Sequence, residues 1–318
     1  MALFLTEDDV KQVLTMELAL ETVEQAFQLM ADGKATNSPR SRLRLPTGVF
    51  NFMTAAAPGA GAMGLKAYGV TRGNPVRFYV HLADTETGEL LTIMEASELG
   101  QVRTGAASGV ATKYMARDDA SRVGVIGAGY QARSQLEAVC KVRYIRSAKV
   151  FSRTPEGRER FASRMSERLG IEVSPAESAE ACVRDVDVVI TMTSSNQAVL
   201  EGQWLQPGVH VNAAGANHWM RRELDDEAVQ RADVIVTDDI ENARAECGDL
   251  IYPIERGLIR WEQVANLSEV IGGRTPGRNS DDDVTLFESQ GLAVEDVTTG
   301  MRVYQLAKEK GLGQELPF

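Results

Sequence analysis

VGVIGAGYQA, residues 123–132, is the most informative segment of the chain for its fold class. A short apolar run suited to a buried strand leads directly into G-x-G-x-x-A, and a segment with helical character follows. Gly127 permits a tight turn, Gly129 lets the backbone approach a pyrophosphate, and Ala132 lets the following helix pack close to the strand. The unbonded N–H groups and the positive dipole end of that helix favour phosphate binding. The stretch therefore predicts the first βαβ unit of a dinucleotide-binding domain.

The sequence around this stretch keeps the strand–helix alternation of an α/β protein. Candidate strands lie between helical stretches at residues 122–126, 148–152, 186–192, 209–213 and 234–236. Strands that alternate with helices form βαβ units, and such units build a parallel sheet. We therefore expect a Rossmann domain with a doubly wound parallel sheet.

The sequence before residue 117 has a different pattern, typical of an α+β region. Thr6 and the acids after it suit the start of a helix, and apolar residues at helical spacing predict one helix over residues 6–32. Alternating residues around a Pro-Thr-Gly turn predict a hairpin over residues 40–54. The further elements that we expect are strands at 64–70, 78–82 and 90–94, a helix at 97–116 and an amphipathic helix at 296–310.

Length and composition narrow the class of protein. The chain of 318 residues is long enough for two domains. Its 34 Lys and Arg against 45 Asp and Glu give a formal net charge of −11, which disfavours a nucleic-acid or membrane-surface partner. The cysteines show no CxxC spacing and the histidines no metal-ligand spacing, so we expect reduced thiols and no metal site. No apolar run could span a bilayer and no signal-peptide pattern is present, so the expected location is the cytoplasm.

The end of the second strand bears on the choice of cofactor. An acidic residue there binds the ribose 2′-hydroxyl of NAD, whereas a nearby arginine suits a 2′-phosphate. Here the segment reads Ser152-Arg153-Thr154, without a carboxylate. We expect NADP(H) to be preferred, with NAD(H) possible if Arg153 is only a solvated surface residue. The predicted cofactor-binding residues are Thr104, Gly127, Gly129, Tyr130, Gln131, Ala132, Ser152, Arg153, Thr154 and Thr193.

A cluster of basic residues precedes the Rossmann domain. Arg40, Arg42 and Arg44 alternate along one predicted strand and would share a face. Lys66 lies among apolar residues, and Arg103 opens the segment Arg-Thr-Gly-Ala. Guanidinium forks and an ammonium group together make a receptor for a carboxylate. Spacing alone leaves open the alternative that these are solvated or salt-bridged surface residues.

The whole chain resembles the ornithine cyclodeaminase/μ-crystallin family. The resemblance rests on stretches spread from about residue 39 to residue 296, and it is specific for the family rather than for one activity. The stretches are Pro39-Arg40, Phe52-Met53, Gly64-Leu65-Lys66, residues 95–106, the GAGYQA loop, residues 222–225, residues 246–250 and residues 285–293.

The resemblance implies a homodimer of two-domain subunits. Residues 1–116 with 297–318 would form a discontinuous α+β dimerisation and substrate domain, and residues 117–296 the dinucleotide-binding Rossmann domain. It also implies that Lys66, Arg103 and a hairpin arginine hold the substrate carboxylate beside the nicotinamide. Arg40 matches the family position best, with Arg42 as the reserve.

Two positions depart from the cyclodeaminases of the family. Asn51 stands where they carry a glutamate that receives the distal amine of the substrate, and Asn217 stands where they carry an aspartate that transfers a proton. The usual Met-Pro-Ala is Met53-Thr54-Ala55 here. An amide cannot shuttle a proton at neutral pH. These departures disfavour ornithine cyclisation.

The leading hypothesis is an NAD(P)H-dependent reductase of a small anionic α-imino acid or cyclic ketimine, with amino-acid dehydrogenation as the reverse reaction. The expected catalytic residues are Lys66, Arg103 and Asn217, and the expected substrate-binding residues are Arg40, Arg42, Asn51, Lys66 and Arg103. Asn217 would orient the nitrogen or a water, unless it faces away and His218 or Lys66 carries the proton. The alternatives are a cyclodeaminase that releases ammonia from a diamino acid and a non-enzymatic, NADPH-dependent small-ligand binder of μ-crystallin type.

Overall fold

The computed structural model describes residues 2–317, which form two compact units. One unit comprises the chain up to Arg103 together with the segment from Leu292, and the other comprises Thr104–Gly291. The sequence placed the divisions after residues 116 and 296. In the structure they fall within helix α3 (Ser97–Met115) and just before helix α11 (Ala293–Glu309).

Close packing explains the division within α3. A Cβ atom on Gly105 would come within 2.4 Å of the carbonyl oxygen of Ser134, on helix α4 (Tyr130–Val142). Gln135, also on α4, donates a hydrogen bond of 3.1 Å to the carbonyl oxygen of Thr104. The part of α3 that begins at Thr104 therefore packs with the rest of the unit Thr104–Gly291.

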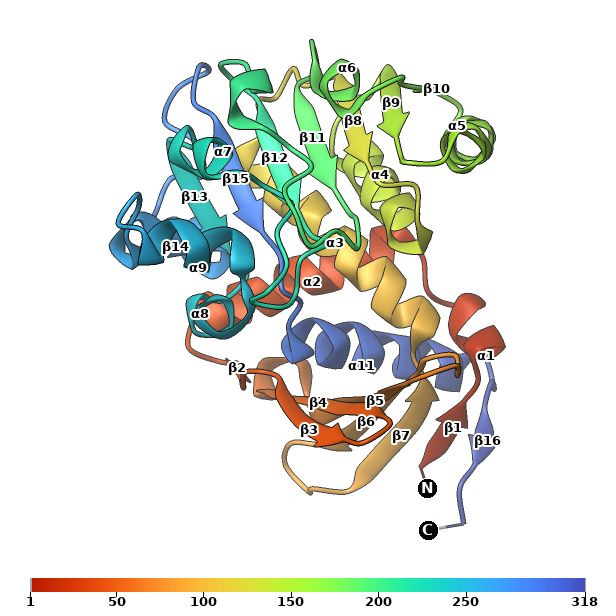
Figure 1. Cartoon of the computed structure of the whole chain (residues 1–318). Helices are drawn as coiled ribbons and strands as arrows, with labels where there is room; N and C mark the ends of the chain where they lie inside the picture. Colours follow the sequence, from red (N-terminus) through yellow and green to blue (C-terminus); the bar gives the residue numbers. More distant parts are fainter. Residues whose placement is uncertain (1, 318) are drawn as a thin grey trace. The chain divides into compact units, whose positions relative to one another are not determined.

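The unit Thr104–Gly291 is built on an eight-stranded sheet in which every pair of strands is parallel (Figure 1). The strands, in their order across the sheet, are β10 (Glu172–Pro175), β9 (Ser147–Phe151), β8 (Arg122–Ile126), β11 (Val188–Thr191), β12 (His210–Ala213), β15 (Thr285–Glu288), β13 (Val234–Thr237) and β14 (Val264–Asn266). The chain winds outward in both directions from the junction of β8 and β11. This arrangement confirms the predicted doubly wound parallel sheet.

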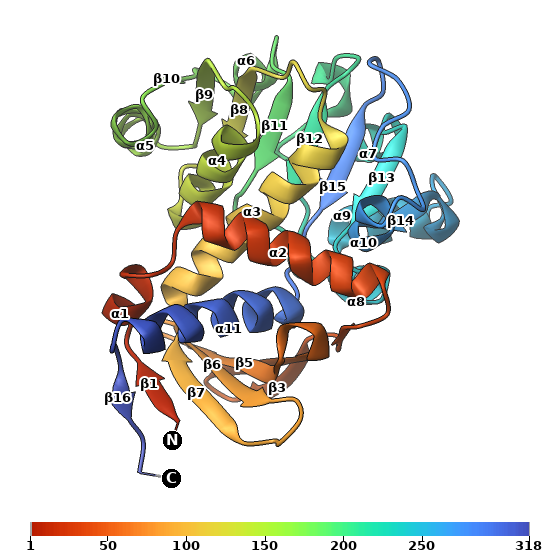
Figure 2. The same ribbon diagram turned by 180° about the vertical axis from the view of Figure 1, so that it is seen from behind.

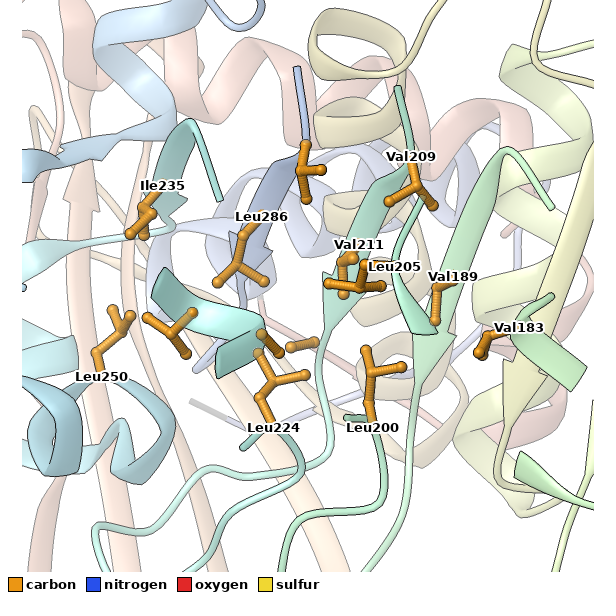
Figure 3. Packing of buried hydrophobic residues seen from close by; sticks show 14 of the residues in the cluster. Val183, Val189, Leu200, Leu205, Val209, Val211, Leu224, Ile235, Leu250 and Leu286 are labelled. Atoms are coloured by element: carbon orange, nitrogen blue, oxygen red, sulfur yellow. The ribbon is translucent and has the colours of Figure 1, made fainter. Parts of the chain in front are cut away.

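Both faces of this sheet are covered, as parallel sheets require. On β11, Val189 belongs to one buried apolar cluster, with Val211 and Leu286 of neighbouring strands (Figure 3). Val188 and Ile190 point to the opposite face and belong to a second buried cluster. Burial on both faces explains why the strands read as continuous apolar runs rather than as alternating patterns.

In this unit helices alternate with the strands along the chain. Three of the strands were not predicted from the sequence. The remaining helices are α5 (Pro155–Leu169), α6 (Ala179–Val183), α7 (Asp226–Gln230), α8 (Ile240–Glu246), α9 (Gly248–Glu255) and α10 (Leu267–Ile271). The sequence prediction missed β10, β14 and β15. Their residues, EVSP, VAN and TLFE, do not form a continuous apolar run such as VVIT of β11 or VIVT of β13. The omission of β15 was the most serious, because it lies between β12 and β13 inside the sheet.

The other unit contains a mostly antiparallel sheet that packs against α11. The strands are β16 (Gln314–Glu315), β1 (Leu3–Leu5), β7 (Leu90–Glu95), β6 (Arg77–Asp84), β5 (Ala62–Thr71), β4 (Gly48–Ala57) and β2 (Thr36–Asn37), with β3 (Ser41–Leu45) paired to β4. Helices α2 (Met16–Ala31) and α11 lie side by side (Figure 2). The two ends of the chain meet where β1 pairs with β16 (Figure 1).

The predicted single helix over residues 6–32 is wrong in one respect, because it is two helices. Helix α1 (Glu7–Lys11) ends before Thr15, which begins α2. The hydroxyl of Thr15 accepts a hydrogen bond of 3.2 Å from the backbone N–H of Leu18, as an N-cap does. The apolar spacing runs through this break and so concealed it.

Candidate active site

The phosphate loop joins β8 to α4 at the centre of the parallel sheet. Gly127 has φ of +116°, a conformation that favours glycine, and a Cβ atom there would lie 2.1 Å from the carbonyl oxygen of Met192. Gly129 is the N-cap of α4, and a Cβ atom on it would meet nothing within 4 Å. No side chain caps α4, so its first N–H groups face that open space. The loop therefore fits a pyrophosphate held by backbone N–H groups.

A cleft of about 540 Å³ lies along this loop. Gly127, Gly129, Ser152, Arg153 and Thr193, all predicted from sequence, line it together. The polar segment 194–197 after β11 also lines the cleft and was not foreseen. A cleft at the carboxyl ends of strands, where the strand order reverses, is the usual site for a dinucleotide in this class of fold.

The other predicted cofactor residues lie around the cleft rather than in its lining. Ala132 is fully buried against the sheet, as close packing of the helix on the strand requires. Tyr130 is 48% exposed at the start of α4. Thr104 receives its bond from α4 through its carbonyl oxygen. Gln131 and Thr154 flank the loop and the end of β9, respectively.

Glu223 binds backbone groups of two loops beside the cleft, and it was not predicted from the sequence. It is fully buried, and its carboxylate accepts hydrogen bonds from the backbone N–H groups of Thr193 (2.6 Å) and Gly215 (2.8 Å). It also accepts a bond of 2.9 Å from the hydroxyl of Thr191. Burial raises the pKa of Glu223, while these bonds oppose that rise. One carboxylate therefore joins the loop after β11 to the loop after β12.

A second candidate site, a group of charged residues that we call the Lys66 cluster, lies in the other unit. On β5, Lys66 is opposite Met53 of β4, so both side chains lie on the same face of the sheet. Its ammonium donates a hydrogen bond of 2.8 Å to Oδ1 of Asp296, on α11. Arg103 binds the same oxygen at 3.1 Å and binds Glu295 at 2.7 Å. The Lys66 cluster consists of Lys66, Arg103, Glu295 and Asp296, all buried.

Glu295 and Asp296 change the predicted picture of this site. The sequence reasoning treated Lys66 and Arg103 as cations available to a substrate carboxylate, and it overlooked the two acids, although residue 296 closes the matching family stretches. Two cations facing two anions leave the Lys66 cluster without net charge. The second carboxylate oxygen of Asp296, Oδ2, is buried and has no hydrogen-bond partner among the described residues. The cluster thus presents cations together with a vacant anionic acceptor.

Burial tunes the acidity of Lys66. Desolvation lowers its pKa from 10.5 to about 8, with the attraction of Asp296 opposing the shift and the charges of Arg103 and Arg40 adding to it. The ammonium lies 5.3 Å from the centroid of the Phe78 ring. A pKa near 8 lets this side chain gain or lose a proton close to neutral pH.

Gly100 makes room for the Lys66 ammonium. A Cβ atom on this residue of α3 would lie 2.9 Å from Nζ of Lys66. A larger residue at position 100 would displace the amine from Asp296. The glycine in the segment Leu99-Gly100-Gln101 therefore has a steric role in the cluster.

Of the predicted hairpin residues, Asn51 is buried and Arg40 is half-buried, whereas Arg42 is exposed. Arg40 is half-buried, and its Nε lies 3.4 Å from the sulfur of Met53. Its charge is close enough to lower the pKa of Lys66. Arg42 lies opposite Asn51 in the β3–β4 pairing and is exposed, whereas Asn51 is 3% exposed. Asn51 thus lies inside the sheet face that carries Met53.

Asn217 lies in the loop that follows β12, at the carboxyl edge of the parallel sheet. It is exposed, while the neighbouring His218 is half-buried and its ring stacks on Trp219 at 6.1 Å between centroids.

Among the described residues, no three His, Cys, Asp or Glu side chains form a group able to hold a metal ion. None of the described helices has the length and apolarity needed to cross a bilayer.

The chain is similar to known proteins over nearly its whole length. The model of the ornithine cyclodeaminase/mu-crystallin family matches residues 1–311. The sequence is 37% identical over 324 residues to alanine dehydrogenase of Archaeoglobus fulgidus, covering 99% of this chain and 98% of that protein.

Two solved structures are closely similar to the whole chain. One is Thermococcus litoralis Δ1-pyrroline-2-carboxylate reductase in complex with NADH and L-proline, with a TM-score of 0.94 and 37% identity over 99% of this chain and 100% of that one. The other is an archaeal alanine dehydrogenase dimer with bound NAD, with a TM-score of 0.94 and 37% identity over 100% of this chain and 99% of that one. Both relatives carry a nicotinamide dinucleotide, as the phosphate loop predicts for this chain.

Proposed function

This chain belongs to the ornithine cyclodeaminase/mu-crystallin family, and we propose that it is an NAD(P)H-dependent reductase of a small α-imino acid or cyclic ketimine. The reverse reaction is dehydrogenation of the corresponding amino acid. Relatives over nearly the whole chain act on such compounds, as their names state. When bound, the nicotinamide dinucleotide supplies or accepts the hydride.

The charge pattern of the Lys66 cluster carries the proposal. A protonated imino acid bears a carboxylate and, next to it, a cationic nitrogen. Lys66 and Arg103 offer donors for the carboxylate, and the vacant Oδ2 of Asp296 offers an acceptor for the N–H of the nitrogen. Arg40 adds the positive charge that the balanced cluster lacks. A site of this kind binds the two ends of the substrate with opposite signs and fixes the α-carbon for hydride transfer.

Proton transfer is assigned to Lys66. The iminium form already carries its proton, so the reduction step needs only a hydride at the α-carbon. In the reverse direction the amine must lose a proton before it can give up its hydride. With a pKa near 8, Lys66 can accept that proton or return it. Asn217 cannot do so, because an amide has no group that titrates near neutral pH.

We assign NADPH as the preferred cofactor, with NADH as an alternative. The end of β9 carries no acid that would bind a ribose 2′-hydroxyl, and Ser152 and Arg153 line the cleft there. The two solved structures described above contain NADH and NAD, respectively.

We assign a homodimer, with the apolar face of the β3–β4 hairpin as its contact. Leu43, Leu45 and Phe50 are 56%, 49% and 38% exposed and lie on one face of the hairpin, opposite the arginines. Exposed apolar side chains gathered on one strand pair favour burial in an interface. The archaeal alanine dehydrogenase forms a dimer. Sedimentation of the wild type beside Leu43→Glu should show a dimer that becomes monomeric.

A substrate screen tests the proposed activity. Purified protein is given NADPH or NADH together with Δ1-pyrroline-2-carboxylate, or with small 2-oxo acids plus ammonia, and cofactor oxidation is followed at 340 nm. Amino-acid product should appear in equal amount to the cofactor oxidised. Tight cofactor binding with no turnover across the panel would instead favour a ligand-binding protein. Ammonia release without net cofactor oxidation would favour a cyclodeaminase.

A further inference from the structure

A pocket of about 250 Å³ lies beside the phosphate loop, between α4 and α5. Arg133 of α4 and Arg160 and Arg164 of α5 line it. Phe161 and Met165, which are almost fully buried, form its apolar floor. Neither the predicted phosphate loop nor the Lys66 cluster accounts for these three arginines.

The three arginines of this pocket, of which Arg133 is half-buried and Arg160 and Arg164 are exposed, form no ion pair with a described acidic residue. The guanidinium carbon of Arg133 lies 6.0 Å from the centroid of the Tyr130 ring. The acid of α4 that could serve this helix pair, Glu137, binds Arg168 at 2.7 Å instead. In a chain with a net charge of −11, three guanidinium groups around one pocket without a carboxylate form a receptor for an anion.

The pocket is continuous with the cofactor cleft. Ala128 and Gly129 line both cavities. At the turn between β9 and α5, a Cβ atom on Gly157 would lie 2.6 Å from the Thr154 hydroxyl and 3.3 Å from the Ser152 hydroxyl. Ser152 lines the cleft and Gly157 lines the pocket, so two hydroxyl groups mark the place where the cavities meet.

We infer that this pocket binds the 2′-phosphate of NADPH, with Arg133 and Arg160 as its main ligands. The inference rests on the proposed function, since it names the form of the cofactor. With the pyrophosphate on the glycine loop, the adenosine ribose of a dinucleotide lies at the end of the second strand, which here is β9. The hydroxyls of Ser152 and Thr154 and the arginines of the pocket would hold a 2′-phosphate at that point. Arg153, which lines the cleft, would add a further positive charge.

Cofactor affinities test the inference. Dissociation constants for NADPH and NADH are measured by titration calorimetry on the wild type, Arg133→Ala/Arg160→Ala and Arg153→Ala. Arg168→Ala is the matched control, because Arg168 lies on α5 outside the pocket and pairs with Glu137. The wild type should bind NADPH at least 10-fold more tightly than NADH. The double variant should lose at least 10-fold in NADPH affinity and less than 2-fold in NADH affinity, while the control changes neither.

A smaller ligand isolates the phosphate. Adenosine 2′-monophosphate should bind the wild type more tightly than adenosine 5′-monophosphate or inorganic phosphate, and this preference should vanish in the double variant. Arg160→Glu should repel the 2′-phosphate and retain NADH binding. Equal loss of NADPH and NADH affinity, unchanged NADPH affinity in the double variant, or a wild type that prefers NADH would overturn the inference.

These outcomes separate the inference from the proposed reductase activity. If the wild type reduces imino acids with NADH and prefers NADH in the titration, the pocket assignment fails and the proposed activity stands. If no imino acid is reduced with either cofactor, the proposed activity fails, and the titrations still decide whether the pocket binds a 2′-phosphate.

Discussion

Replacing Asp296 by Asn is expected to lower kcat/KM for imine reduction and to move its pH dependence to lower pH. The change removes the charge that faces Lys66 at 2.8 Å and Arg103 at 3.1 Å, and it weakens the acceptor assigned to the substrate nitrogen. A hydrogen bond to a charged group contributes about 1.5–3 kcal/mol, and each 1.36 kcal/mol is a factor of ten. The expected loss in kcat/KM is therefore about 10- to 150-fold at pH 7.

The pH profile provides the sharper readout. In the wild type, kcat/KM for reduction should fall as the pH rises through about 8, because Lys66 then loses its proton and its hold on the substrate carboxylate. Asp296 opposes the desolvation that lowers this pKa. Without the carboxylate the pKa of Lys66 should fall further, and the descending limb should move below pH 8.

The free energy of unfolding of Asp296→Asn should also depend on the protonation of Lys66. Removing one partner of a buried ion pair costs about 3–5 kcal/mol. In Asp296→Asn, the pKa of Lys66 lies further below its unfolded value of 10.5. Between these two values the unfolded chain binds more protons than the folded one, so stability rises with pH there. The deficit relative to the wild type should thus be larger at pH 6 than at pH 9 in urea titrations.

The matched control is Glu309→Gln, an exposed acid on the same helix, which should leave kinetics and stability unchanged. A variant at position 296 that keeps the wild-type pH profile and loses less than 3-fold in kcat/KM would refute the assignment. NADH affinity should stay within 2-fold of the wild type, because Asp296 is not among the residues that line the cofactor cleft.

Three further predictions follow from the two sites. Arg40→Ala should raise the KM for the imino acid at least about 10-fold, which is the effect of losing one charged hydrogen bond. Arg42→Ala should change this KM less than 3-fold, because Arg42 is exposed, and the opposite order in steady-state kinetics would assign the role to Arg42. With NAD and ornithine, the wild type should release proline and ammonia at less than about 1 s⁻¹, the low end of enzyme turnover, because the amide of Asn217 cannot act as an acid or a base near neutral pH. A rate above that value in Asn217→Asp would locate the missing group. Glu223→Gln should place an amide against the N–H of Thr193 and raise the KM for the cofactor about 10-fold with kcat nearly unchanged. A lower melting temperature together with a lower kcat would instead indicate a structural role alone.

Features that depend on residues close together in the chain could be predicted from the sequence. The glycine spacing after an apolar run specified the phosphate loop, because the turn and the close helix packing need those small residues within a single βαβ unit. Strand–helix alternation specified the parallel sheet, and alternation around a Pro-Thr-Gly turn specified the β3–β4 hairpin. The basic cluster before the Rossmann domain indicated Lys66 and Arg103 as candidate site residues, and the resemblance to the family gave them a predicted role.

Tertiary structure alone decided the features that join distant parts of the chain. Lys66 and Asp296 are 230 residues apart in sequence, so no local pattern could pair them. The same holds for Glu223, whose carboxylate joins the loops after β11 and β12, and for strand β15, whose place inside the sheet depends on its partners β12 and β13. Hydrogen bonding and desolvation act between atoms that folding brings together, and they set the pKa of Lys66. The sequence shows which residues are present, but only the fold determines which charged side chains face each other.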